Sequence, residues 1–154
     1  VPAKAGIQFF LFMTPGSPLS RGRTGESMPL DSHSAKHAAS SVPGVPQDED
    51  GPVFREPWEA QAFAMTLALF ERGLFTWPEW AATLAGEIKR AQAAGDPDTG
   101  ETYYTHWLNA LERMVTEKKV TDAATLKQYY EAWDHACDRT PHGKPIELQP
   151  GDFR

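Results

Sequence analysis

The sequence contains very little cysteine, since Cys137 is the only one among 154 residues. A single cysteine cannot form a disulfide within the chain, so the fold does not depend on oxidation, and we expect a cytoplasmic protein. Clustered positive charge is also missing, because the formal net charge is −6 and the isoelectric point is near 5.3. Phosphate binding depends on clustered Lys and Arg, so this composition argues against nucleic acid as a partner.

Two apolar patterns are absent as well. No stretch approaches the roughly 18 consecutive apolar residues that a membrane-spanning helix requires, so we expect no membrane association. No alternating pattern of useful length indicates a β-strand. The apolar share of 40% is slightly under the globular norm, which fits a small core joined to a tail.

Residues 1–52 have the composition of a disordered tail, because Pro, Gly, Ser and Ala dominate them. Such a segment buries too little apolar surface to offset its chain entropy, so we predict no fold there. Its short apolar run, IQFFLFM, is followed by no clean small-residue cleavage site, which argues against a secretory signal. The opening VPAKAGIQ resembles the translated product of bacterial intergenic repeats, and Met28 is therefore the expected translation start.

A helical region is predicted over residues 53–140, which hold all five tryptophans. Its first helix begins near Pro57, a residue tolerated in a first turn, and ends at Gly73, where a left-handed residue suits a helix end. Apolar residues recur along this helix in two neighbouring stripes, Trp58, Ala62, Met65 and Leu69 in one and Phe63, Leu67, Phe70 and Leu74 in the other.

Three further helices follow. Thr76 and Glu79 form a capping-box pattern at the start of the second helix, which ends in the loop GDPDTG. The third helix is predicted from about Glu101 to Lys118, with a weaker capping box of Asp98 and Glu101, and the fourth starts after Thr121 and ends before Thr140 and Pro141. The prediction is an all-α fold of about four helices in a small bundle or hairpin arrangement, followed by a short irregular tail over 141–154.

The aromatic content of this helical region suggests a protein partner. A helix with two apolar stripes needs burial on two sides, and four short helices cover only part of that surface. Each aromatic residue taken alone also suits an ordinary core, so the inference depends on their sum. Aromatic side chains are the usual anchors of interfaces. The candidate contact residues are Trp58, Phe63, Leu74, Phe75, Trp77, Trp80, Tyr103, Tyr104 and Trp107.

No pattern of residues predicts catalysis. The sequence has no Gly-rich phosphate loop, no supported Ser-His-Asp arrangement and no pair of Cys-x-x-Cys motifs, so we predict no catalytic residue and no enzymatic activity of the isolated chain. Cys137 and His142 are candidates for transient binding of a soft metal, but two ligands fall short of a closed site. We therefore expect no stably bound cofactor.

Three stretches of the helical region and of the segment after it together resemble a known family. They are PWEAQAFAMTLALFERGLFTWPEWAATLAGEI, GDPDTGETYYTHWLNALERMV and WDHACDRTPHGKPIEL, and they cover about residues 54–148. In this order they resemble the nitrile hydratase accessory (activator) proteins, and they are similar to the N-terminal helical half of the nitrile hydratase β subunit. A full β subunit would be expected to open with a His-Asp-x-Gly-Gly type segment and to end in a small β-barrel, and this sequence contains neither.

The resemblance implies a maturation factor that binds the nitrile hydratase α subunit in place of β. It would escort α while its metal, most often cobalt, is loaded and its claw cysteines are oxidised, before α passes to β. The Cys-x-x-Cys-Ser-Cys claw that holds the metal in α is absent here, so we expect cobalt to be held by the client α subunit.

Other interpretations remain open from the sequence. One is a divergent or truncated β subunit that stays in a nitrile-hydrating complex, and another is a helical interaction domain with an unrelated partner. The resemblance also leaves open a client of the thiocyanate hydrolase type.

Overall fold

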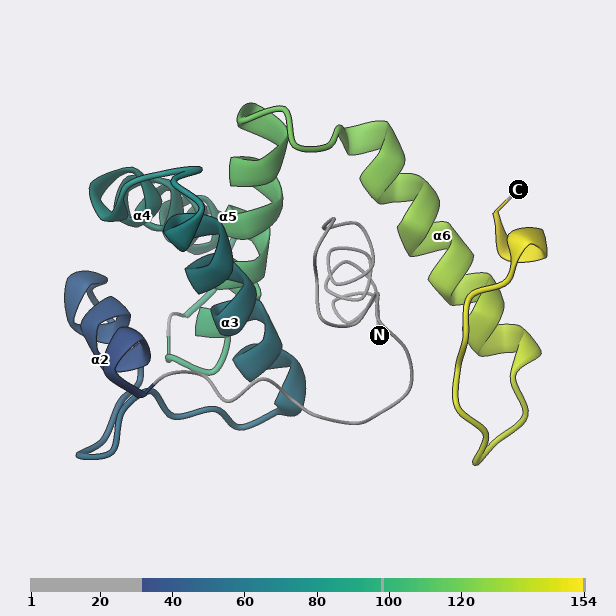
Figure 1. Ribbon diagram of the computed structural model, residues 1–154, viewed down its shortest axis with the longest axis horizontal. Coiled ribbons are helices and arrows are strands. Elements are labelled where there is room, and N and C mark those ends of the chain that lie inside the picture. The colour runs from purple at the N-terminus through teal and green to yellow at the C-terminus, as the bar shows by residue number, and fades with distance from the viewer. Residues whose placement is uncertain (1–31, 98, 154) are drawn as a thin grey trace.

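The computed structural model describes residues 32–97 and 99–153, and this part of the chain is built from helices (Figure 1). Five α-helices are followed by one 3-10 turn: α2 Ser32–Ser41, α3 Pro57–Glu71, α4 Trp77–Ala93, α5 Tyr103–Glu117, α6 Ala123–Arg139 and η2 Pro150–Asp152. The predicted all-α class is confirmed, with five described helices where about four were expected. Each described helix is too short or too polar to cross a membrane.

Helix α2 is the one that the sequence prediction missed. Its buried side chains are small, and together with two valines of the following turn they pack against the rest of the core: Ala35, Ala38, Ala39, Val42 and Val45. The helix contacts α3, and the hydroxyl of Tyr103 donates a hydrogen bond to the carbonyl oxygen of Pro43 at 3.3 Å. The predicted disordered tail is therefore wrong for residues 32–52. Its remaining part, with the IQFFLFM run and Met28, lies outside the described residues.

The predicted start of the second helix is confirmed. The amide of Thr76 donates to the Glu79 carboxylate at 2.8 Å, and the amide of Glu79 donates to the Thr76 hydroxyl at 3.4 Å. This capping box and the Lys118 ammonium, 3.0 Å from the same carboxylate, lower the pKa of Glu79. The first turn of α4 is thus fixed by local contacts and tied to the end of α5.

Three helices end in the same way. In α3, the amide of Gly73 donates to the carbonyl oxygen of Phe70 and the amide of Leu74 to that of Leu69, which is the Schellman pattern. The same pattern closes α4 at Gly95 and α5 at Lys119. All three residues have positive φ, and Lys119, with φ of 57°, is the one non-glycine residue of the described chain that does.

Two predicted helix starts need correction. Helix α6 begins after Asp122, whose carboxylate accepts from the amide of Thr125 at 2.8 Å, so Asp122 and not Thr121 is its N-cap. Helix α5 begins at Tyr103 with no side-chain cap, and Asp98 of the predicted capping box lies outside the described residues.

The core is an interlocking set of aromatic rings between α3, α4 and α5. Trp107 of α5 stacks on Phe63 of α3 and contacts Trp80 of α4, with ring centroids 5.3 and 4.9 Å apart. The Trp107 indole donates a hydrogen bond to the Thr66 hydroxyl at 2.8 Å, and that hydroxyl donates to the carbonyl oxygen of Ala62. Because the polar edge of this central ring is satisfied, its burial carries no unpaired donor.

Helix α6 contributes Leu126, near its start, to the core cluster, and beyond that it stands apart from the other helices (Figure 1). We call α2–α5 the body, and residues 123–153, which comprise α6 and the segment that returns along it, the arm. Asp152, which is buried, accepts two hydrogen bonds from the Arg139 guanidinium and one from the amide of Gln149. The rings of Tyr129 and Phe153 meet edge to face at 4.9 Å. Of the predicted irregular tail over 141–154, the described residues 141–153 fold back on α6, a contact that the sequence prediction missed.

Candidate protein interface at the α5–α6 junction

Seven of the nine predicted contact residues lie in the core of the body. They are Phe63, Phe75, Trp77, Trp80, Tyr103, Tyr104 and Trp107, and each is less than 9% exposed. Burial raises the pKa of both tyrosines well above the usual value. In this conformation their side chains are not available to a partner, and any protein that binds this chain would have to contact other residues. The ordinary core role, which the sequence left open, accounts for these seven.

The two remaining predicted contact residues, Trp58 and Leu74, are partly buried and pack against the same core. Trp58 lies in the first turn of α3, and Leu74 follows its last. They retain some surface that a partner could cover.

One face of α5 is tied to α4 by a buried carboxylate. Glu87 of α4 bonds to the Arg113 side chain of α5 and to that of Arg90 on its own helix. Burial works to raise the pKa of Glu87, but the hydrogen bonds from the two guanidinium groups prevail and lower it. Glu87 is therefore ionised near neutral pH, and it fixes α5 against α4 next to the point where the chain leaves the body.

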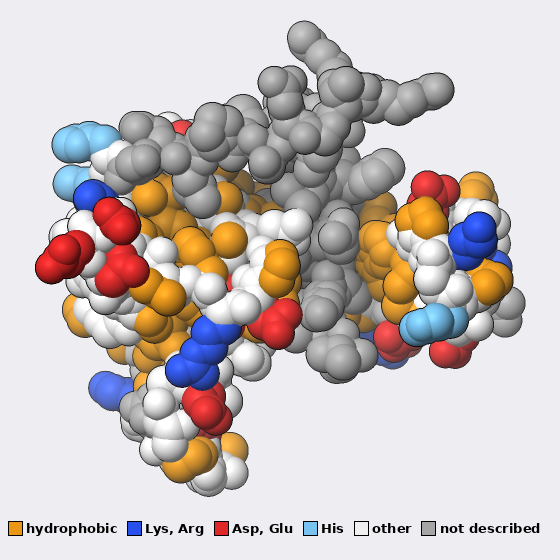
Figure 2. Space-filling view, turned by 90° about the horizontal axis from the view of Figure 1, so that it is seen from below, with side chains coloured by type: hydrophobic (Ala, Val, Ile, Leu, Met, Phe, Trp, Pro, Cys, Tyr) orange, Lys and Arg blue, Asp and Glu red, His pale blue; other side chains and the backbone are white. Residues whose placement is uncertain are grey.

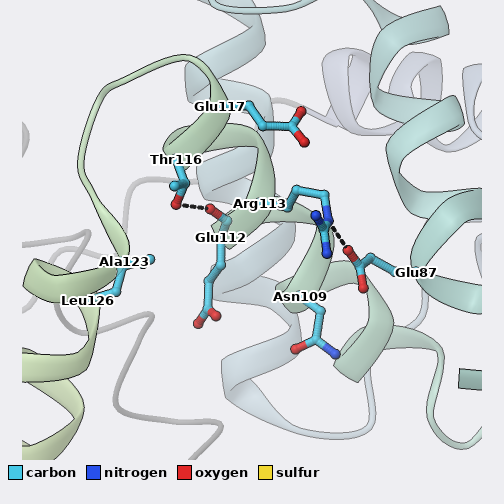
Figure 3. Close-up of a pocket in the computed structure, with 8 residues that line it drawn as sticks. All are labelled: Glu87, Asn109, Glu112, Arg113, Thr116, Glu117, Ala123 and Leu126. Atoms are coloured by element: carbon cyan, nitrogen blue, oxygen red, sulfur yellow. Dashed lines mark hydrogen bonds and ion pairs between the residues drawn. The ribbon is translucent and has the colours of Figure 1, made fainter. Parts of the chain in front are cut away.

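Beside this ion pair is a shallow groove of about 400 Å³, where the arm joins the body (Figure 3). It is lined from three helices by Glu87, Asn109, Glu112, Arg113, Thr116, Glu117, Ala123 and Leu126. The side chain of Glu112 points away from Glu117 and from the Arg113–Glu87 pair (Figure 3). Its charge is therefore not balanced by the nearest guanidinium.

Glu112 makes the main polar contact across this junction. The hydroxyl of Tyr130 on α6 donates a hydrogen bond to its carboxyl group. Burial raises the pKa of Glu112 to about 7. The group can thus gain or lose a proton near neutral pH, and each change alters the contact that links the arm to the body.

Apolar side chains remain exposed around this junction and on the body. Figure 2 shows hydrophobic side chains on the side of the arm that faces the body. The large apolar residues exposed in the described chain are Val53, Val120, Ile146 and Phe153. Val120 lies in the connection between body and arm, and Ile146 and Phe153 belong to the returning segment of the arm. Three of these four residues therefore lie on the arm or in the connection that leads to it.

The predicted transient metal ligands lie at the far end of the arm. Cys137 is exposed near the end of α6, and His142 is exposed in the turn that follows. His135 is engaged elsewhere, since its Nδ1 lies 2.8 Å from the carbonyl oxygen of Asp152. Among the described residues, no group of three or more His, Cys, Asp or Glu side chains is placed to hold a metal.

Sequence reasoning missed the junction itself. Glu112, Arg113 and Tyr130 occupy ordinary helical positions, and nothing in their spacing indicates that they meet residues of other helices. A weak signal was available, because Glu112 lies between the apolar residues Leu111 and Met114 of a predicted helix.

One comparison with known proteins found a match. The family model described as nitrile hydratase beta subunit, N-terminal, matches residues 40–144, which is more than half of the chain. The match spans α3, α4, α5, α6 and the end of α2. Comparison with the curated proteins found no match, and comparison with the solved structures found none either.

Proposed function

The chain belongs to the family of nitrile hydratase β subunit N-terminal domains, and on this premise we propose that it is a non-catalytic maturation factor that binds the nitrile hydratase α subunit in place of β. The arm is the observation that carries the proposal. It is a helix held away from a self-contained core, with aromatic and aliphatic side chains left for another protein to cover.

The difference in packing between the body and the arm supports reversible binding. The body is packed around buried aromatic rings and needs no partner to complete it. The arm meets the body through the Glu112–Tyr130 contact and the buried Leu126, so its angle can adjust at modest cost. An escort that must later release its client needs an interface weaker than the final one.

In this proposal the chain holds no cofactor stably. The client α subunit holds the metal, cobalt being the expected one, while its cysteines are oxidised. The accessory chain covers the α surface that β later occupies, and its own contribution is protein binding in the cytoplasm.

A second function has support from the same family match, which names a β subunit. The chain would then be a divergent β-type subunit that remains in the active enzyme. The two proposals make opposite statements about stoichiometry, because an escort leaves the mature enzyme and a subunit does not.

The deciding experiment is co-expression of nitrile hydratase α and β subunits, with and without this chain, in cobalt-supplemented cells. Two quantities are measured on the purified enzyme: cobalt per α subunit and nitrile-hydrating activity. We expect both to collapse without the chain, while the active enzyme contains none of it. Activity that is independent of the chain contradicts a role in maturation, and one copy per α in the active enzyme establishes the subunit instead.

A pair of matched substitutions tests whether the arm is the contact surface. Ile146→Ser alters the arm, and Val53→Ser alters the body, at residues that are 43% and 41% exposed. We expect Ile146→Ser to weaken binding to the isolated α subunit about tenfold and Val53→Ser to leave it unchanged. Isothermal titration of each purified variant against α measures this, and equal effects of the two would show that the arm is not the site.

A further inference from the structure

The connection between the body and the arm has the features of a hinge. Residues 118–122 join the end of α5 to the start of α6. The ammonium of Lys118 is held to the body by the Glu79 carboxylate at 3.0 Å, and Lys119 turns the chain with its left-handed φ of 57°. Beyond this point α6 packs mainly against its own returning segment. A rotation within the connection would therefore move the arm as one piece, while the body keeps its packing.

Two side chains of α6 hold the arm against the body. Leu126 reaches the core cluster, and the hydroxyl of Tyr130 donates a hydrogen bond to the carboxyl group of Glu112 on α5. Both residues lie in the first half of α6, close to the connection. Because contacts near a pivot act with a short lever, a small change at Glu112 can produce a large displacement at the far end of α6.

The positive charge on the body side of the groove is already used. Arg113 is the cation among the residues that line the groove, and its guanidinium is bonded to Glu87 of α4, which also binds Arg90. Glu117 adds another carboxylate to the lining, and the side chain of Glu112 points away from it and from the Arg113–Glu87 pair (Figure 3). Neither α4 nor α5 thus offers Glu112 a cation from this lining.

The charged groups on the connection and on α6 are engaged as well. Asp122 accepts from the amide and the hydroxyl of Thr125 at 2.8 and 3.0 Å, and these bonds lower its pKa. Lys127 pairs with Glu131 on its own helix at 3.4 Å. The group that α6 presents to Glu112 is the hydroxyl of Tyr130, which is a neutral donor.

Ionisation of Glu112 therefore places a charge where the junction offers it one neutral donor. The side chain is partly buried, and burial raises its pKa to about 7. A carboxylate held away from water without a cation is costly, and it regains hydration when the groove opens. A protonated carboxyl group carries no charge, so it can stay in the closed groove with its hydrogen bond to Tyr130.

We propose that the α5–α6 junction is a pH-sensitive hinge, in which the arm rests against the body while Glu112 is protonated and swings away when Glu112 ionises. The closed junction binds this proton more tightly than the open one does. Closure is therefore fully favoured below pH 4.5 and weakens as the pH rises through about 7. The hinge works without a partner, so it can be present in a chain that does not bind the α subunit, and the reverse also holds.

The test is the distance between arm and body in the purified full chain, measured by pulsed electron paramagnetic resonance at pH 5.5 and 8. Cys137, the single cysteine, is exposed on the arm and takes one nitroxide label, and Gln61→Cys, at an exposed position of α3, takes the other. Cys137 lies about 21 Å along α6 from its start, so a rotation of about 15° displaces it by about 5 Å. We expect a displacement of about this size, with an unchanged far-ultraviolet circular dichroism spectrum.

Two variants show whether Glu112 is the group that titrates. Glu112→Gln does not ionise, so the distance should stay at its pH 5.5 value at both pH values. Glu117→Gln, an exposed residue that lines the same groove, should keep the full change. The hinge would be overturned by a wild-type distance that is equal at the two pH values, or by a change that persists in Glu112→Gln. Loss of the change in Glu117→Gln, or loss of helical signal over the same range, would also overturn it.

Discussion

The body and the arm both contain aromatic helices, but different contacts hold them in place. In the body, rings from α3, α4 and α5 interlock around Trp107, and its polar edge is bonded to Thr66. In the arm, the returning segment is fixed to α6 by the carboxylate of Asp152 and the guanidinium of Arg139. The body is therefore stabilised mainly by close packing and the arm largely by directed polar contacts.

This difference bears on how the protein can bind another one. A close-packed core tolerates little change, because any shift opens cavities or causes clashes. In the arm, the Arg139 guanidinium is 41% exposed, so water can replace part of its contact with Asp152 more easily than it can replace a buried ring. We therefore expect the body to behave as a rigid platform and the arm to adapt to a partner.

The largest expected change in the free energy of unfolding distinguishes the body from the arm. Trp80→Ala removes a fully buried ring between Phe75 and Trp107 and should lower the free energy of unfolding by about 3–5 kcal/mol. Trp133→Ala removes a partly buried ring of the arm and should cost no more than about 2 kcal/mol. Urea unfolding followed by circular dichroism measures both, and equal losses would contradict the distinction between body and arm.

The next effect concerns the junction and depends on pH. The pKa of Glu112 is about 7 in the folded protein, against 4.5 for an unperturbed group. The folded state therefore binds this proton more tightly than the unfolded chain does. The contribution of protonated Glu112 to the free energy of unfolding is complete below pH 4.5 and is lost as the pH rises through about 7.

Glu112→Gln should remove this dependence, because the amide does not ionise. At pH 8 the variant should be more stable than the wild type by about 2 kcal/mol, with about 3 kcal/mol as the ceiling. Urea unfolding at several pH values between 5 and 8 gives the comparison. Glu117→Gln, at an exposed position of the same helix, is the matched control and should leave the pH profile unchanged. A profile unaltered by Glu112→Gln would place the titrating group elsewhere.

The smallest expected change in the free energy of unfolding concerns the end of α5, where the chain leaves the body for the arm. Lys119 closes α5 in the left-handed conformation, with φ of 57°, where its side chain is disfavoured and glycine is not. Lys119→Gly should raise the free energy of unfolding by about 0.5–1 kcal/mol. Lys118→Gly, at a residue with φ of −79°, should lower it by a similar amount. Thermal unfolding compares the two, and a loss of stability in both would contradict this account.

Features fixed by neighbouring residues could be predicted from the sequence. The capping box of Thr76 and Glu79 and the helix end at Gly73 involve contacts within a few residues, and both are present in the structure. The stop before Thr140 and Pro141 was found for the same reason. Asp122 was overlooked because Thr121 and Asp122 are both good N-caps, and only the backbone geometry distinguishes them.

The helix α2 could not be predicted from composition. Its buried residues are alanines, which give no large-residue stripe, and its high Ser content is typical of disordered segments. Small side chains pack closely only when a complementary surface already exists, and here the body provides it.

The sequence by itself determined the helical class, most helix boundaries and the family resemblance, because these depend on local propensity, capping and the order of short motifs. The tertiary structure decided which aromatic residues are core and which surface remains exposed. It also decided that Glu112 meets Tyr130 and that the last residues return to α6. These outcomes depend on contacts between residues far apart in the chain, and the spacing of residues along one helix does not specify the angle at which another helix leaves it.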